Sequence, residues 1–162
     1  MRTLGIDHGS RRFGLALSDP TGRFSRPLDS VDGEKGLLDR LPKLISDEGV
    51  SRIVLGLPRN MDGSLGKKAQ EVLKFAALLR ERFPVPVDTW DERLTTVQAE
   101  RHLREAGVSP RRWKGRVDSM AAQILLQSYL DARSPAEADA GIEERMATEP
   151  PLDEGSRDGD RV

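Results

Sequence analysis

The chain has 162 residues, no cysteine and a formal net charge of −1. This length suits one domain with a buried core, and the absence of thiols excludes disulfides, thiolate zinc sites and a cysteine nucleophile. No apolar run approaches the roughly 18 residues of a membrane span, and the N-terminus shows no basic-then-apolar leader, so we expect a soluble, cytoplasmic protein.

Hydrophobic periodicity predicts elements in the order β-β-β-α-β-α-β-α-α. Pro27 favours an edge position for the third strand, and Pro42 is expected to interrupt the first helix. The fourth strand is a continuous apolar run, which is typical of a strand buried on both faces. In chain order, the predicted elements cover residues 2–8, 12–18, 23–31, 34–47, 52–57, 65–82, 83–90, 95–106 and 118–133.

Charge divides the chain into a basic body and an acidic tail. Residues 134–162 hold nine acids and three bases, which leaves 23 bases and 18 acids in residues 1–133. The tail has few large apolar residues, so we expect it to be disordered. It is either a solubilising extension or a mimic of nucleic acid that competes for a basic groove. The basic body favours a polyanionic partner.

Asp7 is the first candidate catalytic residue. It shares one face of its predicted strand with Gly5. If the small residues of the next strand lie on that face too, they leave room for a metal ion beside the carboxylate. Because a buried, unpaired carboxylate is costly, Asp7 needs a cation. That cation is either a metal ion or, in an ordinary ion pair, Arg11 or Arg12.

Three more acids lie near the ends of predicted elements. Asp91 and Glu92 come at the end of the strand at 83–90. Adjacent strand residues face opposite sides, so one of these two acids at most can join Asp7. Asp118 opens the last predicted helix, at the rim of its apolar stripe. Each acid also has an ordinary interpretation, as a turn acid beside an arginine or as a helix N-cap.

The acids become informative together if their elements converge. A carboxylate cluster in a chain with no cysteine and two histidines suits hard cations such as Mg²⁺ or Mn²⁺. Two such ions can clamp the attacking and leaving oxygens of a phosphodiester. Nearby basic side chains suit a phosphate backbone, and those chosen as candidate substrate-binding residues are Arg59, Arg93, Lys114 and Arg116.

Four segments, in this order, resemble the YqgF/RuvX family: GIDHGSRRFGLALSD (5–19), IVLGLPRNMDGS (53–64), WDERLTT (90–96) and KGRVDSMAAQILLQSYL (114–130). Members of this family are described as pre-16S rRNA nucleases or as similar to Holliday junction resolvases. The resemblance covers about residues 2–133 and leaves out the tail. We therefore expect a nuclease domain over 1–133 and an acidic tail over 134–162.

The resemblance implies an α/β, ribonuclease-H-like fold with a five-stranded mixed sheet flanked by helices. It also implies a metal-binding and catalytic carboxylate triad, which carries over onto Asp7, Glu92 and Asp118. The expected activity is Mg²⁺- or Mn²⁺-dependent hydrolysis of a nucleic acid.

The substrate stays open, since ribosomal RNA precursors and branched DNA are both associated with the family. Resolving a junction would require two active sites and hence a homodimer, whereas trimming one RNA end would not. One alternative is a non-catalytic factor that binds RNA or junctions during ribosome assembly. A second is an actin-like or sugar-kinase-type ATPase, whose first strand also carries an Asp-x-Gly turn. That fold needs a second lobe, for which this chain is too short.

Overall fold

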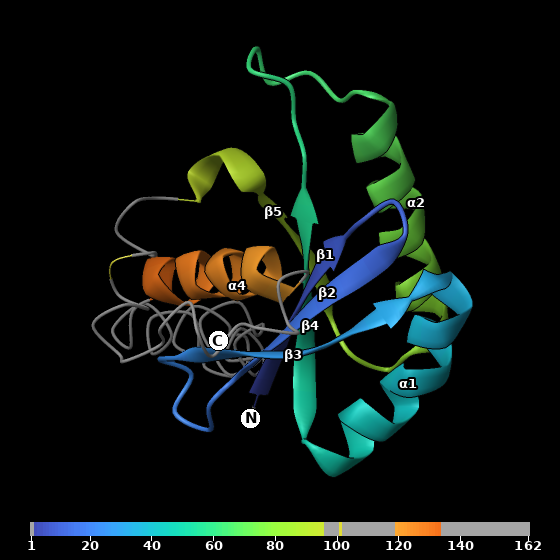
Figure 1. Ribbon diagram of the computed structural model, residues 1–162, viewed down its shortest axis with the longest axis vertical. Coiled ribbons are helices and arrows are strands. Elements are labelled where there is room, and N and C mark those ends of the chain that lie inside the picture. The colour runs from blue at the N-terminus through green and yellow to red at the C-terminus, as the bar shows by residue number, and fades with distance from the viewer. Residues whose placement is uncertain (1, 96–100, 102–118, 134–162) are drawn as a thin grey trace, which may run out of the picture. The chain divides into compact units, whose positions relative to one another are not determined.

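The structure is a computed structural model that describes residues 2–95, 101 and 119–133. Its strands are β1 (Arg2–His8), β2 (Arg12–Ser18), β3 (Ser25–Asp32), β4 (Val50–Leu57) and β5 (Val87–Asp91). Its helices are α1 (Gly33–Asp47), α2 (Lys67–Arg82), the short 3₁₀ turn η1 (Glu92–Leu94) and α4 (Met120–Ala132). Figure 1 shows these elements on one ribbon.

The five strands form one mixed sheet in the order β3-β2-β1-β4-β5. β2 runs antiparallel to β1 and β3, whereas β1, β4 and β5 are parallel. β3 lies at an edge of the sheet, as Pro27 predicts. The parallel direction brings the carboxyl ends of β1, β4 and β5 to the same edge of the sheet.

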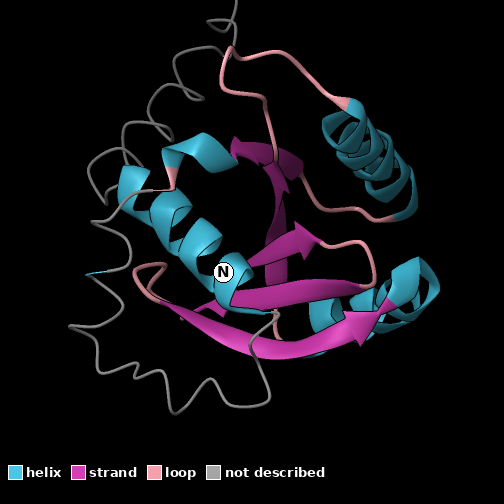
Figure 2. Cartoon of the chain, turned by 45° about the horizontal axis from the view of Figure 1, so that its top comes forward, coloured by secondary structure: helices cyan, strands magenta, loops and turns pink. Residues whose placement is uncertain are grey.

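Helices cover both faces of the sheet, with α1 and α2 on one side and α4 on the other (Figures 1 and 2). The larger core lies under α1 and α2, where Leu4, Ile6 and Leu55 are fully buried. The smaller core lies under α4 and includes Ala16 and Val54. These two sets alternate along the strands, as the period of two in a β-strand requires.

Apart from shifts of one or two residues at element ends, two predictions within the described residues differ from the structure. α1 continues through Pro42 instead of being interrupted there. A proline removes one backbone donor, but Leu41 and Leu44 on either side are buried, and such packing sustains a helix. The strand predicted at 83–90 begins only at Val87, after two prolines.

Two of the predicted segments involve residues that the structure does not describe. The helix predicted at 95–106 and the acidic tail at 134–162 lie almost entirely outside the described residues. Among the helices that are described, none has the length and apolar character needed to span a membrane.

Candidate active site

Asp7 lies near the carboxyl end of β1, on the sheet face that α4 covers. Its direct cross-strand partner is Gly14, and Gly5 pairs in the same way with Ala16. The small residues of β2 therefore share a face with Asp7, which was the condition for leaving room beside its carboxylate. A Cβ atom on Gly5 would lie 2.9 Å from Cβ of Leu126, so α4 packs directly against the backbone of β1.

Glu92 begins η1, directly after β5, which lies two strands away from β1, and its side chain reaches back toward Asp7. Gly56 on β4 pairs with Trp90, and β4 lies between β1 and β5. A Cβ atom on Gly56 would lie 2.8 Å from Oε1 and 3.3 Å from Cγ of Glu92. The missing side chain of Gly56 thus leaves the space that the Glu92 carboxyl group fills. The carboxyl groups of Asp7 and Glu92 lie close enough for each to shift the pKa of the other.

This carboxyl pair has unusual protonation energetics. Burial raises the pKa of Asp7 above its ordinary value, while the Lys68 ammonium and the neighbouring Glu92 carboxyl group act in the opposite direction. Burial also raises the pKa of Glu92, and repulsion from Asp7 adds to the effect, with Lys68 again opposing it. A further positive charge between the two acids would stabilise their ionised forms.

The donors fit a divalent cation. Carboxylate oxygens are the ligands that Mg²⁺ and Mn²⁺ prefer. Asp7 lies in β1, and Glu92 lies in the turn directly after β5. Across residues 2–95, 101 and 119–133, no group of three acids, histidines or cysteines is placed to hold a metal ion. The described part of the chain thus brings together two candidate ligands, Asp7 and Glu92. Arg12, considered from the sequence as an ordinary partner of Asp7, forms an ion pair with Asp32 at 3.0 Å.

Asp91 has a different environment from its neighbour Glu92. Its Oδ2 accepts hydrogen bonds from Nη2 of Arg93 at 2.7 Å and from Nε at 3.0 Å. Nε of Arg59 lies 3.9 Å from the same oxygen. Hydrogen bonds from Arg93 lower the pKa of Asp91. Asp91 thus holds two candidate phosphate-binding arginines, while Glu92 is the acid that meets Asp7.

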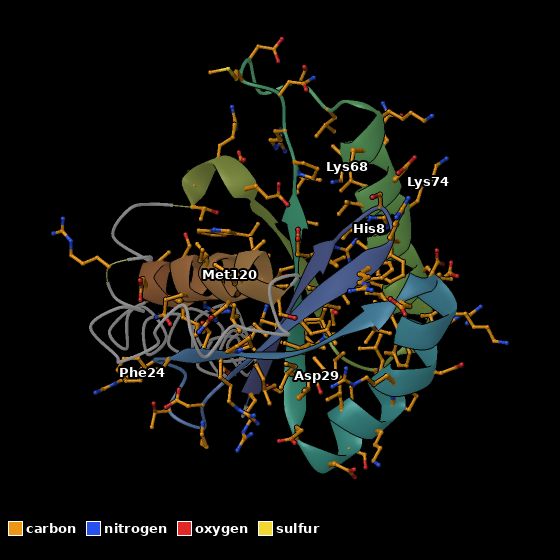
Figure 3. All side chains as sticks on the ribbon, viewed as in Figure 1. His8, Phe24, Asp29, Lys68, Lys74 and Met120 are labelled. Atoms are coloured by element: carbon orange, nitrogen blue, oxygen red, sulfur yellow. The ribbon has the colours of Figure 1, made fainter. Side chains whose placement is uncertain are left out.

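His8 faces away from Asp7, as its position on the strand predicts. Its ring contacts those of Phe13 and Phe75, with centroids 4.8 Å and 5.5 Å away. In Figure 3 it lies beside α2.

Three of the predicted site residues, Asp118, Lys114 and Arg116, lie outside the described residues. The first described residue of that segment, Ser119, ties the start of α4 to the sheet. Its hydroxyl accepts a hydrogen bond from the backbone N–H of Leu15 at 3.2 Å and donates one to the carbonyl of Leu28 at 2.6 Å.

Sequence reasoning missed Lys68, which acts electrostatically on both carboxyl groups. It lies in the first turn of α2 (Figure 3). A usable signal existed, because α2 connects the parallel strands β4 and β5. The first turn of such a connecting helix lies near the sheet edge at which the preceding strand ends.

Comparison with known proteins gives a consistent result. The family model described as "RuvX: Holliday junction resolvase" matches residues 1–132. A relative from Geobacillus kaustophilus, named "Putative pre-16S rRNA nuclease", is 47% identical over 137 residues, which cover 82% of this chain and 99% of that protein. A protein of the same name from Pelotomaculum thermopropionicum is 42% identical over 144 residues, covering 87% of this chain and 94% of the relative.

Solved structures agree on the fold. RuvC of T. thermophilus, in complex with a Holliday junction substrate, superposes with a TM-score of 0.58 at 16% identity, covering 82% of this chain and 95% of RuvC. The Fowlpox virus resolvase, in complex with Holliday junction DNA, gives a TM-score of 0.52 at 12% identity, covering 83% and 99%. The chain therefore belongs to the RuvX family and has the ribonuclease-H-like fold of the RuvC-type resolvases.

Proposed function

We propose that this protein is a metal-dependent nuclease that hydrolyses phosphodiester bonds in structured nucleic acid. The observation that carries the proposal is the Asp7–Glu92 pair at the carboxyl edge of the sheet, with both pKa values raised. Asp118 completes the proposed ligand set. When bound there, Mg²⁺ or Mn²⁺ would supply an activated water and neutralise charge on the phosphate.

The chain's own residues would then bind and orient the substrate. Asp7 and Glu92 hold the cation against the sheet. Asp91 fixes the guanidinium groups of Arg59 and Arg93, which bind backbone phosphates beside the cleavage point. Lys114 and Arg116 extend this basic surface.

The relatives and the family model support two substrates. The names of the curated relatives favour the ends of a pre-16S rRNA, and the description of the family favours a Holliday junction. Junction resolution would require a homodimer with two sites, whereas RNA trimming would work with one. Comparing the cleavage of an RNA probe with that of a junction probe therefore identifies the substrate. The substrate in turn indicates whether a monomer or a homodimer is expected.

The test is cleavage of an end-labelled rRNA precursor and of a labelled four-way DNA junction, each with Mg²⁺, with Mn²⁺ or with a chelator. We expect Asp7→Asn, Glu92→Gln and Asp118→Asn to lower cleavage by more than about a hundredfold, because losing even a residue that only supports a metal ligand costs 10–100-fold. Asp39→Asn is the matched control, since Asp39 is exposed on α1, which packs on the opposite face.

Equal cleavage by the wild type and all three variants would identify a contaminating enzyme and refute the proposed site. Salt-sensitive binding of both probes without metal-dependent cleavage would instead favour a non-catalytic RNA- or junction-binding factor.

A further inference from the structure

The ladder between β2 and β3 contains a β-bulge beside the candidate active site. Between Phe13 and Leu15 the register of β3 shifts by one residue, so that two residues of β3 lie opposite Gly14. Gly14 is also the cross-strand partner of Asp7, on the other side of β2. A bulge interrupts the backbone hydrogen bonds of a ladder, and bulges are over-represented next to active sites. The interruption thus lies directly beside the strand that carries Asp7.

The hydroxyl group of Ser119 bridges the two strands at this bulge. Its Oγ accepts a hydrogen bond from the backbone N–H of Leu15 in β2 and donates one to the carbonyl of Leu28 in β3. Leu15 and Leu28 are Cα partners in the ladder, so one hydroxyl serves both strands. Ser119 is fully buried, and a buried backbone N–H needs a partner. Met120 and Asp29, the chain neighbours of this bridge, are labelled in Figure 3.

Packing along α4 directs its first turn toward the end of β1 that carries Asp7. A Cβ atom on Gly5 would lie 2.9 Å from Cβ of Leu126 and 3.4 Å from the carbonyl oxygen of Ala122. Because the Ser119 bridge is attached on the Asp7 side of Gly5, α4 runs antiparallel to β1. Asp7 lies two residues beyond Gly5 on the same face, about 6.6 Å farther along the strand. One helical turn rises about 5.4 Å, so the turn that begins at Ser119 covers this step.

A second buried serine connects a later part of α4 with the sheet. Oγ of Ser25 donates a hydrogen bond to the carbonyl of Gln123 at 2.9 Å, and the backbone N–H of Ser25 donates one to Oε1 of Gln127 at 3.0 Å. Ser25 begins β3 and pairs with the last residue of β2. Ser25 and Ser119 therefore use the same chemistry in different places, because Ser119 lies at the bulge and Ser25 lies at the far end of β2.

We propose that Ser119 is a positioning residue for the metal site, because its hydroxyl holds the start of α4 where the preceding residue, Asp118, meets the cation bound by Asp7. The inference rests on the proposed function in one respect, which is that Asp118 is a metal ligand. The groups around a metal ligand must hold it within about 0.5 Å of its working position. Ser119 supplies this support through the main chain, since one peptide bond joins it to Asp118.

The test measures the affinity of the full-length protein for Mn²⁺ alone, by electron paramagnetic resonance of free Mn²⁺ and without nucleic acid. The variants are Ser119→Ala, which removes the bridge, Ser119→Thr, which keeps the hydroxyl, and the matched control Ser25→Ala. Asp118→Asn, alone and combined with Ser119→Ala, completes a double-mutant cycle. Urea denaturation establishes that each variant is folded under the assay conditions. If Ser119→Ala is not folded, Ser119→Cys takes its place, since a thiol fills the space but hydrogen-bonds weakly.

We expect Ser119→Ala to lower the affinity for Mn²⁺ by about tenfold, which is the lower end of the range for residues that support a metal ligand. Ser119→Thr should bind Mn²⁺ like the wild type. Ser25→Ala should lose stability, since it also removes a buried hydrogen bond, but it should keep its affinity for Mn²⁺. In the Asp118→Asn background, Ser119→Ala should have no further effect on the affinity, because the carboxylate that Ser119 positions is gone.

Equal affinities of the wild type and Ser119→Ala for Mn²⁺ would overturn the inference, as would no binding of Mn²⁺ by the wild type. An equal loss in Ser119→Ala and Ser25→Ala would also overturn it, since that result indicates a general loosening of α4, and so would the same loss with and without Asp118→Asn. The proposed nuclease function fails separately. Metal-dependent cleavage that needs Asp7 would stand even if Ser119 had no effect on the affinity. Ser119-dependent binding of Mn²⁺ by a protein that cleaves neither nucleic acid would leave the inference intact and refute the nuclease.

Discussion

Replacing Gly56 with alanine would test whether close packing against β4 places the Glu92 carboxyl group. The new Cβ atom would lie 2.8 Å from Oε1 of Glu92 and 3.1 Å from Cδ2 of Leu125. Ordinary van der Waals contact begins near 3.4 Å. The carboxyl group must therefore move by about 0.6 Å, the difference between 2.8 and 3.4 Å, to relieve the overlap.

This displacement sets the expected magnitudes. Overpacking a core site costs about 1–3 kcal/mol, and replacing a strand glycine by alanine returns about 0.5–1 kcal/mol. The free energy of unfolding should therefore fall by about 1 kcal/mol. Since a 1 Å misplacement can cost about a hundredfold in rate, a shift of about 0.6 Å predicts a roughly tenfold decrease in cleavage.

The assay is a double-mutant cycle by urea denaturation, in a chelator, on the wild type, Gly56→Ala, Glu92→Ala and the double variant. Removing the Glu92 side chain beyond Cβ removes the overlap, so Gly56→Ala should cost less stability in that background. Gly36→Ala is the control, because its Cβ atom would meet Cγ1 of Val31 at 3.0 Å, remote from the carboxyl pair. An identical cost of Gly56→Ala in both backgrounds would refute the reasoning and leave Leu125 as the source of strain.

Two other predictions concern stability. A raised pKa means that ionised Asp7 destabilises the folded state, so wild-type stability falls as the pH rises from the ordinary value of 3.8 through the higher folded-state value. In a chelator, Asp7→Asn should raise the melting temperature near neutral pH. The gain should vanish below pH 3.8, and a constant gain at every pH would contradict the linkage. Ser128→Ala should lower the free energy of unfolding by about 1–3 kcal/mol. Its hydroxyl accepts a hydrogen bond from Nε1 of Trp90 and donates one to the carbonyl of Leu94, so an unchanged urea midpoint would contradict this.

The strands were predictable wherever alternation was strong. The first two strands have the predicted bounds, because apolar and small residues alternate strictly in both. At 83–90 the prediction failed for four residues. There the apolar residues Phe83 and Val85 mimic a strand, but Pro84 and Pro86 lack the N–H groups that a ladder requires. Periodicity carries no information on strand order, and the resemblance to a known family was needed for the mixed sheet.

The part of the candidate site that depends on the alternation of residues within one strand was predictable from the sequence. The strand period separates Asp91 from Glu92, and the structure turns Glu92 toward Asp7. Lys68 and Gly56 were not predicted, since their roles depend on how α2 and β5 lie beside β4. The roles proposed for Asp118, Lys114 and Arg116 stay predictions, because these residues lie outside the described part of the chain.

Support for Glu92 comes from two sides of the same turn. Gly56 provides the space beneath its carboxyl group, and Ser128 on α4 holds the carbonyl of Leu94 at 2.9 Å. Both supports belong to regular elements, because Gly56 lies in β4 and Ser128 in α4. Changes in the supports should therefore lower the rate of cleavage more than the affinity for nucleic acid. This expectation follows from geometry, because a rigid sheet edge places the reacting groups.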